Sequence, residues 1–443
     1  MRKSRILGGV FKMITRKEKR EREKNKNYFF ELMKTQRHFF KDFNKWLGRI
    51  KDSRHQSYIT YDSDILLMMI ILKNACDLRS MRTMTNEFNK EEAIENIKKI
   101  LNMEELSELP HYDTINDYLS TVQPSELENI ITFMIKELLK KRCFDDYRIN
   151  GKYWGVVFDG TGLFSFDKKH CEHCLRREYT DKETGEVKVK YMHHVLEAKL
   201  VVGDMVLSIG SEFIENESEN ISKQDCELKA FHRLAKKVKE NFKRLPICIL
   251  GDSLYACESV FKKCDEYRWH YLFRFKQGRI KSIAEDFQAI KQLEQQSAES
   301  NPIFWTNDIA YNQRTVNMIE YESEKRFTYI TNIKITSKNS SRLVNAGRSR
   351  WKIENEGFNR QKNVRYHIEH PNSHNYTAMR NHYLLTQITD ILMQLFEKGS
   401  KFLKTFKKTM KEISANLLEA IRTRILTDND MTLMAKPIQI RFP

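Results

Sequence analysis

The spacing of apolar residues changes about a third of the way along the chain, and this change constrains the fold more than any other feature. From Tyr28 onward, apolar residues recur at roughly the helical interval. One helix is predicted to open on a capping box formed by Thr114 and Asp117, and another to follow Pro124. Residues 1–148 are therefore predicted to form an all-helical domain.

Beyond that point the apolar runs are short and rich in strand-forming residues, and amphipathic helices alternate with them. The run VVFDG closes a short strand at Asp159, and CILGDS closes a buried strand at Asp252. Residues 191–214 read as two strands joined at a turn of Gly203 and Asp204. The order of three strands, a helix, a strand, a helix and a strand predicts an α/β core.

The balance of charge points to a polyanionic partner. Lys and Arg number 77 against 60 Asp and Glu, a net charge of +17, which favours nucleic acid. The charged segment 16–27 is a candidate arm for phosphate contacts. The longest apolar run, from Ile65 to Leu72, is too short to span a membrane, and no signal-peptide pattern is present. We expect a cytoplasmic protein with reduced thiols and no membrane partner.

Two aspartates follow predicted strands. In α/β sheets, functional side chains gather at the carboxyl ends of the strands. An aspartate at such a point also commonly caps the next helix or makes a turn, and this reading stays open for Asp159 and for Asp252 taken singly. A third carboxylate downstream favours the functional reading of both.

That third carboxylate is one of two glutamates in RSRWKIENEGFNRQKN, residues 348–363. A helical projection at about 100° per residue places Glu354 on one face with Trp351 and Phe358. Glu356 falls on the opposite side. The projection predicts that Glu354 faces inward and that Glu356 is a surface residue.

An inward-facing carboxylate is costly unless it is paired or binds a metal. Arg350, one turn earlier, is a candidate partner for Glu354 in a structural ion pair. Alternatively, Glu354 converges with Asp159 and Asp252 on a divalent cation. Mg²⁺ or Mn²⁺ is then expected, because both prefer oxygen ligands, and such ions would activate a water or a 3′-hydroxyl for phosphodiester chemistry.

At this point the sequence resembles a family. The order of elements and the stretch RWKIE are similar to the DDE transposases of bacterial insertion sequences, the cut-and-paste family with the Tyr-Arg-Glu-Lys signature. The resemblance implies that Asp159, Asp252 and Glu354 are the catalytic residues and Mg²⁺ ligands, and that Arg350 is a supporting basic residue.

Two positions depart from the family signature. Gly347 stands where the family has its Tyr, and Gln361 stands where the family has its Lys. Lys362, one position later, is therefore the candidate contact to a DNA phosphate.

The resemblance also implies a fold: a ribonuclease H-like catalytic domain, with a mixed five-stranded sheet flanked by helices, an all-α N-terminal domain, and a small insertion before the last catalytic helix. Separations of 93 and 102 residues between the three carboxylates fit the branch of the family with a β-rich insertion. The expected segments are a helical DNA-binding domain with a basic arm (1–148), the first part of the catalytic core (149–279), the insertion (280–326), the last strand and the Glu-bearing helices (327–397), and a basic C-terminal tail (398–443).

The implied activity is metal-dependent cleavage of DNA at insertion-sequence ends, followed by strand transfer into target DNA. Double-stranded DNA, both terminal inverted repeats and target, is the implied partner of a homodimer associated with the bacterial nucleoid. Two alternatives remain open: a ribonuclease H-like metal nuclease without strand transfer, and a non-catalytic DNA-binding relic of a transposase.

Two further patterns supply candidate residues. The basic, aromatic run RWHYLFRFKQGR offers Arg274, Lys276 and Arg279 as phosphate contacts.

The second pattern is HCEHC, residues 170–174, which is followed by a histidine pair. Cys171, Cys174 and His193 are candidate ligands of a structural Zn²⁺ that would brace the loop after the first strand. Free thiols and ordinary strand histidines are the alternative.

Overall fold

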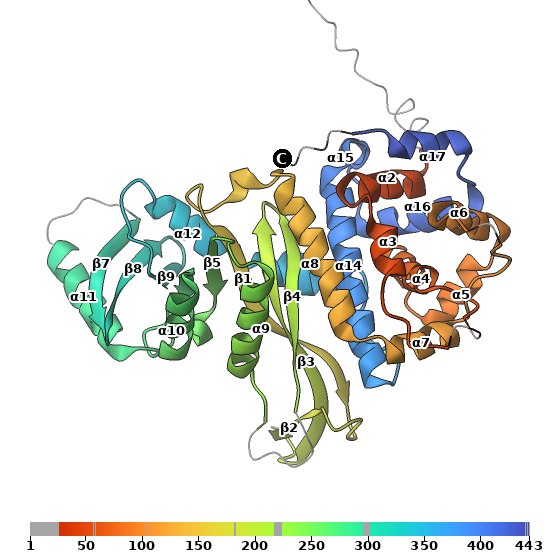
Figure 1. Ribbon diagram of the computed structural model, residues 1–443. Coiled ribbons are helices and arrows are strands. Elements are labelled where there is room, and N and C mark those ends of the chain that lie inside the picture. Colours follow the sequence, from red (N-terminus) through yellow and green to blue (C-terminus); the bar gives the residue numbers. More distant parts are fainter. Residues whose placement is uncertain are drawn as a thin grey trace, which may run out of the picture.

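A computed structural model gives the fold of the chain (Figure 1). The structure describes residues 26–438, except 56, 58, 104, 181–182, 217–223 and 296–301, together with 440 and 442. Most of the candidate basic arm, residues 16–25, lies outside the described residues. A helical body lies at one end of the molecule, and a long sheet runs from it to the other end.

The helical body combines helices from both ends of the chain. Its longest helix, α14, is buried along most of its length between the N-terminal helices and the sheet, and it contacts α4, α7, α8 and β4. The helices of this body are α2 (Tyr28–Phe39), α3 (Phe43–Gly48), α4 (Ser63–Ala75), α5 (Met81–Phe88), α6 (Glu91–Leu101), α7 (Tyr112–Thr121), α8 (Pro124–Lys140), α14 (Tyr376–Gly399), α15 (Lys401–Phe406), α16 (Met410–Thr423) and α17 (Asp428–Ala435).

Two predictions for this body are wrong. Helix α7 takes His111 as its N-cap, so the predicted capping box of Thr114 and Asp117 lies inside the helix. The C-terminal segment is not a tail, because α16 packs on α2 and α6, and α17 packs on α2. Apolar residues of α16 at helical spacing, including Ile413 and Leu417, are buried in that contact and leave the basic residues outside.

The sheet is mixed and has nine strands among the described residues. Five of them, in the order β4-β3-β1-β5-β6, form one continuous part of this sheet, with β5 and β6 parallel to β1. The strands are β1 (Trp154–Phe166), β2 (Leu175–Thr180), β3 (Val187–Val202), β4 (Met205–Ile214), β5 (Ile247–Gly251), β6 (His270–Arg274), β7 (Ile303–Tyr311), β8 (Arg314–Glu322) and β9 (Arg326–Thr331).

The predicted strand count of five is too small for two reasons. Strand β2 pairs with the first half of β3 and lengthens that hairpin beyond the core. Strand β9 pairs antiparallel with β6, and β8 and β7 follow it outward. The predicted insertion, 280–326, thus forms α11 (Lys281–Gln295), β7 and β8, and these strands continue the same sheet instead of forming a separate unit.

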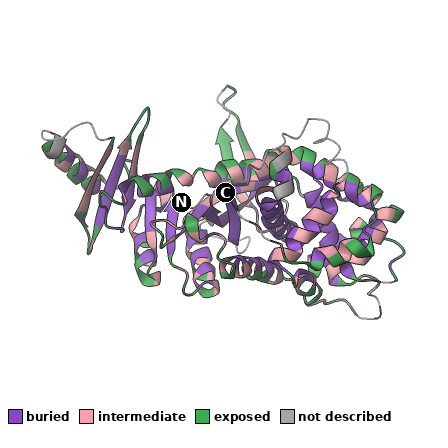
Figure 2. Ribbon diagram, turned by 90° about the horizontal axis from the view of Figure 1, so that it is seen from above, coloured by how far each residue is buried: buried purple, intermediate pink, exposed green. Residues whose placement is uncertain are grey.

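Helices cover both faces of the sheet. Phe158 of β1 packs with Phe231 of α9 (Glu227–Asn241) on one face, where α10 (Glu258–Tyr267) also lies. Val157 belongs to a second core with Leu343 of α12 (Ser340–Ser349) and Phe358 of η4 (Ile353–Phe358). Because neighbouring residues of a strand point to opposite faces, α12 and η4 cover the other face. Figure 2 shows buried positions, in purple, along the sheet and the inner sides of the helices.

Within the described residues, none of the helices combines the length and the apolar character needed to cross a membrane.

Candidate active site

Asp159 and Asp252 lie at matching positions of two neighbouring strands. Strands β1 and β5 are parallel, and Val157 is in register with Leu250. Each aspartate follows two residues later, and adjacent strands lie only about 4.8 Å apart. Strand β1 does not end at Asp159 as predicted, because its pairing with β3 continues to Phe166.

The loop that carries Asp252 is held by local hydrogen bonds. Asp252 is the N-cap of η3 (Ser253–Tyr255), and its Oδ1 accepts a hydrogen bond from the backbone N–H of Leu254 at 2.7 Å. The capping reading is therefore correct for Asp252, and it leaves the functional reading open. The Arg279 guanidinium donates to the carbonyls of Leu254 at 2.7 Å and Ala256 at 3.3 Å. Arg279, predicted as a phosphate contact, thus supports this loop.

Glu354 lies in η4, which is a π-helix. The prediction that it faces inward beside Trp351 is wrong: Glu354 is exposed, and Trp351 is 53% exposed, whereas Phe358 is buried. A π-helix turns less per residue than an α-helix, so the projection at about 100° does not apply. Glu356 is half-buried and accepts a hydrogen bond from Arg360 at 3.0 Å, so it is not a simple surface residue either.

Arg350 pairs with Asp159 and not with Glu354, because its Nη1 lies 3.3 Å from the Asp159 Oδ2. Burial raises the pKa of Asp159 to about 7. Arg350 opposes this rise, and the negative charges of Glu227, Asp252 and Glu354 add to it. Three carboxylates therefore act on Asp159, which is the one paired with Arg350.

Glu227 is the member of this group that the sequence analysis missed. It lies in the first turn of α9, and its Oε1 accepts a hydrogen bond from the Tyr255 hydroxyl at 2.6 Å. A Cβ on Gly160 would lie 2.9 Å from the Glu227 Oε2, so the carboxylate occupies the space that this glycine leaves. Burial raises the pKa of Glu227, and the charge of Asp252 adds to the rise. An acidic residue at a helix start is so common that only the glycine after Asp159 could have signalled it.

The carboxylates have the chemistry that a divalent cation needs, but among the described residues they do not form a group whose ligand atoms all lie within 4.8 Å of one another. Each donor is a hard oxygen, the ligand type that Mg²⁺ and Mn²⁺ take in proteins. Burial is the main cause of the raised pKa of Asp159, and a bound cation would relieve the repulsion from neighbouring carboxylates that adds to it. The exposure of Glu354 leaves one side of the group open to a substrate.

Two of the predicted phosphate contacts already have partners within the protein. The Arg274 Nη2 donates to the carbonyl of Arg326 at 2.6 Å, and burial lowers the pKa of Arg274. Lys362 forms an ion pair with Glu369 at 2.9 Å. Lys276, by contrast, is exposed.

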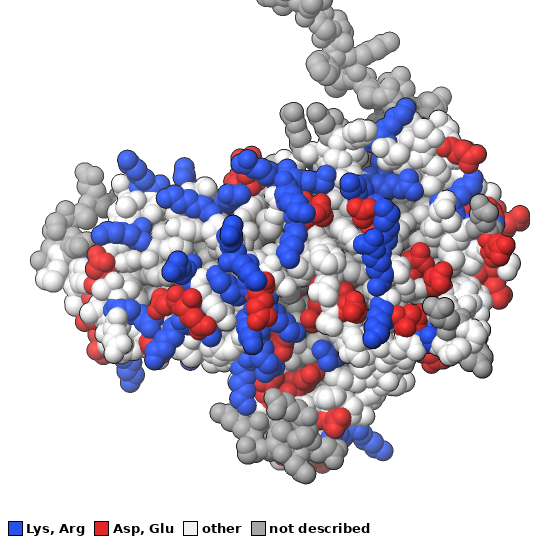
Figure 3. Space-filling view, in the orientation of Figure 1, with Lys and Arg blue, Asp and Glu red and all other residues white. Residues whose placement is uncertain are grey.

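Other basic residues precede Arg350 in the chain. Lys338, Arg342 and Arg348 are exposed on α12 and the segment before it, and of these basic residues Arg350 is the one paired with Asp159. Figure 3 shows bands of Lys and Arg on one face of the molecule, over both the sheet and the helical body. Such a surface attracts a phosphate backbone.

The two departures from the family signature have structural reasons. A Cβ on Gly347 would lie 2.5 Å from the ring of Tyr329 of β9, which fills the space there. Gln361 is buried and donates to Asp390 at 2.8 Å, so its side chain faces the core. A lysine at that position would have to be buried.

The predicted zinc ligands also meet. Cys171, Cys174 and His193 lie within hydrogen-bonding distance of one another at the end of β1, apart from the carboxylates.

Comparison with known proteins supports a DDE-type transposase. A family model described as the transposase DDE domain matches residues 222–389, which include Asp252 and Glu354 but not Asp159. The match covers less than half of the chain, from just before α9 into α14. No curated protein matches the sequence.

Proposed function

We propose that the chain is a DNA transposase in which Asp159, Asp252 and Glu354 hold Mg²⁺ or Mn²⁺ and cut DNA at the ends of an insertion sequence. The register of β1 and β5 carries the proposal, because Asp159 on β1 and Asp252 directly after β5 follow residues that are paired. The charge of Glu354 also acts on Asp159. The family match over residues 222–389 supports the proposal independently. When bound, the metal would activate a water or a 3′-hydroxyl and stabilise the leaving oxygen.

The other residues of the site hold the ligands in place. Arg350 balances the charge of Asp159 and becomes available to a DNA phosphate once a cation takes over that role. Arg279 fixes the loop of Asp252 through two backbone carbonyls. Tyr255 orients Glu227 beside Gly160.

Double-stranded DNA is the proposed substrate and partner. The exposed residues Lys276, Lys338, Arg342 and Arg348 would contact phosphates, so the affinity should fall steeply with salt. The N-terminal helices would bind the terminal inverted repeats. A homodimer is proposed because two ends must be cut and joined together.

The test uses linear DNA that carries the element ends and a supercoiled plasmid as target. We expect cleavage that requires Mg²⁺, followed by joining of the 3′-ends to the plasmid, and neither product from Asp252→Asn. Cleavage without joining would favour a ribonuclease H-like nuclease, and DNA binding without cleavage would favour a catalytically inactive relic. Cleavage that survives Asp252→Asn would overturn the proposal.

A further inference from the structure

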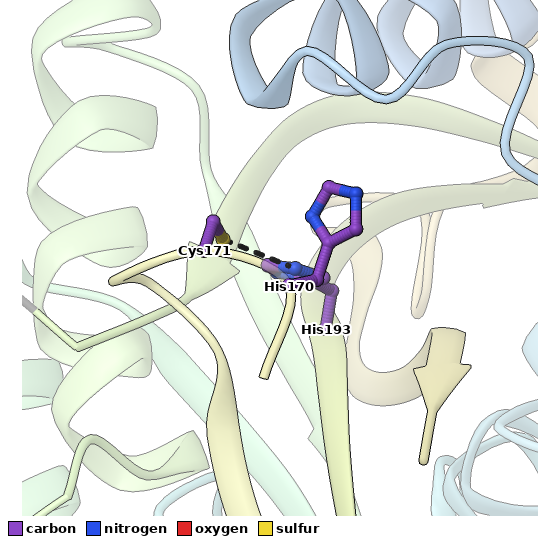
Figure 4. A group of neighbouring side chains, drawn as sticks. All are labelled: His170, Cys171 and His193. Carbon is purple, nitrogen blue, oxygen red and sulfur yellow. Dashed lines mark hydrogen bonds between the residues drawn. The ribbon is translucent and has the colours of Figure 1, made fainter. Parts of the chain in front are cut away.

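A second group of metal-ligating side chains lies at the base of the β2–β3 hairpin. The Sγ atoms of Cys171 and Cys174 are 3.7 Å apart, and the Nε2 of His193 lies 3.5 Å from the first and 3.4 Å from the second. Figure 4 shows Cys171, on the loop after β1, and His193, on β3, directed toward each other. Phe166, where β1 ends, lies seven residues beyond Asp159, which corresponds to about 23 Å along the strand.

These separations match the edges of a zinc tetrahedron. With Zn–S bonds of about 2.3 Å and Zn–N bonds of about 2.0–2.1 Å, the S···S edge is about 3.8 Å and each S···N edge about 3.6 Å. All three observed distances agree with these edges within about 0.2 Å. A disulfide would need the sulfur atoms about 2.05 Å apart.

His170 is the candidate for a fourth ligand. Its ring lies in one group with Cys171 and His193, whose ligand atoms are all within 4.8 Å of one another. The Nδ1 of His170 is buried and lacks a hydrogen-bond partner among the described residues, whereas its Nε2 lies 3.3 Å from His374. A metal-bound histidine commonly uses one ring nitrogen for the metal and engages the other in a hydrogen bond. In His170, Nδ1 is thus the nitrogen available to a metal, and Nε2 is the one in contact with His374.

We propose that Cys171, Cys174, His193 and His170 bind one Zn²⁺. Two thiolates and two imidazoles favour zinc over Mg²⁺, and four protein ligands leave no position for a substrate, so the site is structural. The metal joins the loop between β1 and β2 to β3 and, through the contact of His170 with His374, to the segment before α14. The proposal is independent of the carboxylate site and of the proposed function.

The experiment measures metal in the full chain, purified through a tag without histidines and without chelator. We expect about one zinc per chain, and loss of most of it in Cys174→Ser and His193→Ala. His170→Ala should weaken binding and keep part of the zinc, because three ligands remain. Cys226→Ser, at an exposed cysteine, is the matched control and should keep the metal. Cobalt in place of zinc should give the visible spectrum of a tetrahedral thiolate complex.

Alkylation of the wild-type protein keeps the test decisive if a variant fails to fold. Zinc should protect Cys171 and Cys174 from iodoacetamide, and a chelator should expose both, while the alkylation of Cys226 stays unchanged. A folded protein without zinc or cobalt binding would overturn the proposal. Zinc that persists at full content in Cys174→Ser would overturn it equally, because the metal would then be bound elsewhere.

Discussion

The carboxylate site includes Asp159 of β1, the cysteine–histidine cluster begins in the loop after this strand, and the two sites are assembled in different ways. The carboxylates come from positions 159, 227, 252 and 354, and only the topology of the sheet brings them together. The cluster takes three residues from one short loop and the fourth from the neighbouring strand. The first site depends on the whole α/β core being folded, whereas the second depends on one hairpin. A mutation in the carboxylate site should therefore leave the cysteine–histidine cluster intact, and the reverse should also hold.

The largest effects are expected from one variant in each site, since one should lose DNA cleavage and the other should lose zinc. Asp252→Asn removes a charged oxygen donor, and we expect DNA cleavage to fall about 1,000-fold or more while the zinc content stays at the wild-type level. Cys174→Ser should lose zinc and keep most of the cleavage. Metal analysis and a cleavage assay on the same preparations measure both. A common loss of zinc and cleavage in both variants would show that the two sites are not separate.

Removal of zinc should lower the free energy of unfolding of the protein. Binding to the folded state alone contributes about 3–4 kcal/mol when free zinc exceeds its dissociation constant about 100- to 1,000-fold. Thermal unfolding of the wild type with zinc and with chelator should therefore differ, and Cys174→Ser should show no such difference. An equal response of the variant and the wild type would contradict the hairpin site.

Asp159→Asn should show how far the buried charge of Asp159 lowers the stability of the folded protein. The folded-state pKa of Asp159, about 7, lies above its ordinary value of 3.8, so the folded protein binds the extra proton and stability falls as pH rises from about 4 to about 7. Without divalent metal, the variant should be more stable than the wild type by about 4 kcal/mol at pH 8, and nearly equal to it at pH 4. Denaturant unfolding at both pH values measures this. A variant that is less stable at pH 8 would mean that the Arg350 pair outweighs the repulsion.

Glu227→Gln should have a moderate effect on the carboxylate site only. It removes one negative charge beside Gly160 and keeps the size of the side chain. We expect the Mg²⁺ concentration for half-maximal cleavage to rise about tenfold, because a loss of about 1.4 kcal/mol in cation attraction is enough for that change. Tyr255→Phe, which removes only the hydrogen bond to Glu227, is the control and should shift the midpoint less. An unchanged Mg²⁺ midpoint in Glu227→Gln would exclude this residue from the metal site.

The smallest effect is expected at Lys276. Lys276→Ala should weaken DNA binding similarly for all sequences and reduce the slope of log affinity against log salt by about 1. Lys362→Ala should change this slope less, because Lys362 already pairs with Glu369. Binding isotherms at several salt concentrations test both. A larger change of slope in Lys362→Ala than in Lys276→Ala would show that Lys362 is the more important phosphate contact, contrary to this prediction.

The sequence predicted the parts of this arrangement that depend on local pattern. The hairpin turn at Gly203, the strand before Asp252 and the meeting of Cys171, Cys174 and His193 follow from short runs of residues, and the structure has all three.

The parts that failed depend on tertiary structure. The π-helical turn of η4 changes which side chains face out, so no projection with a fixed angle could orient Glu354. The continuation of β1 past Asp159 depends on its pairing with β3. Glu227 was missed because its nearness to Gly160 comes from the packing of α9 against the sheet.

The central claim is that Glu354, and not its neighbour two residues away, belongs to the metal site. Its most direct test is Mg²⁺-dependent cleavage of DNA with the element ends by Glu354→Gln and by Glu356→Gln. We expect Glu354→Gln to abolish cleavage, and we expect Glu356→Gln, which only weakens the pair with Arg360, to retain most of it. Cleavage that survives Glu354→Gln and disappears in Glu356→Gln would contradict the account.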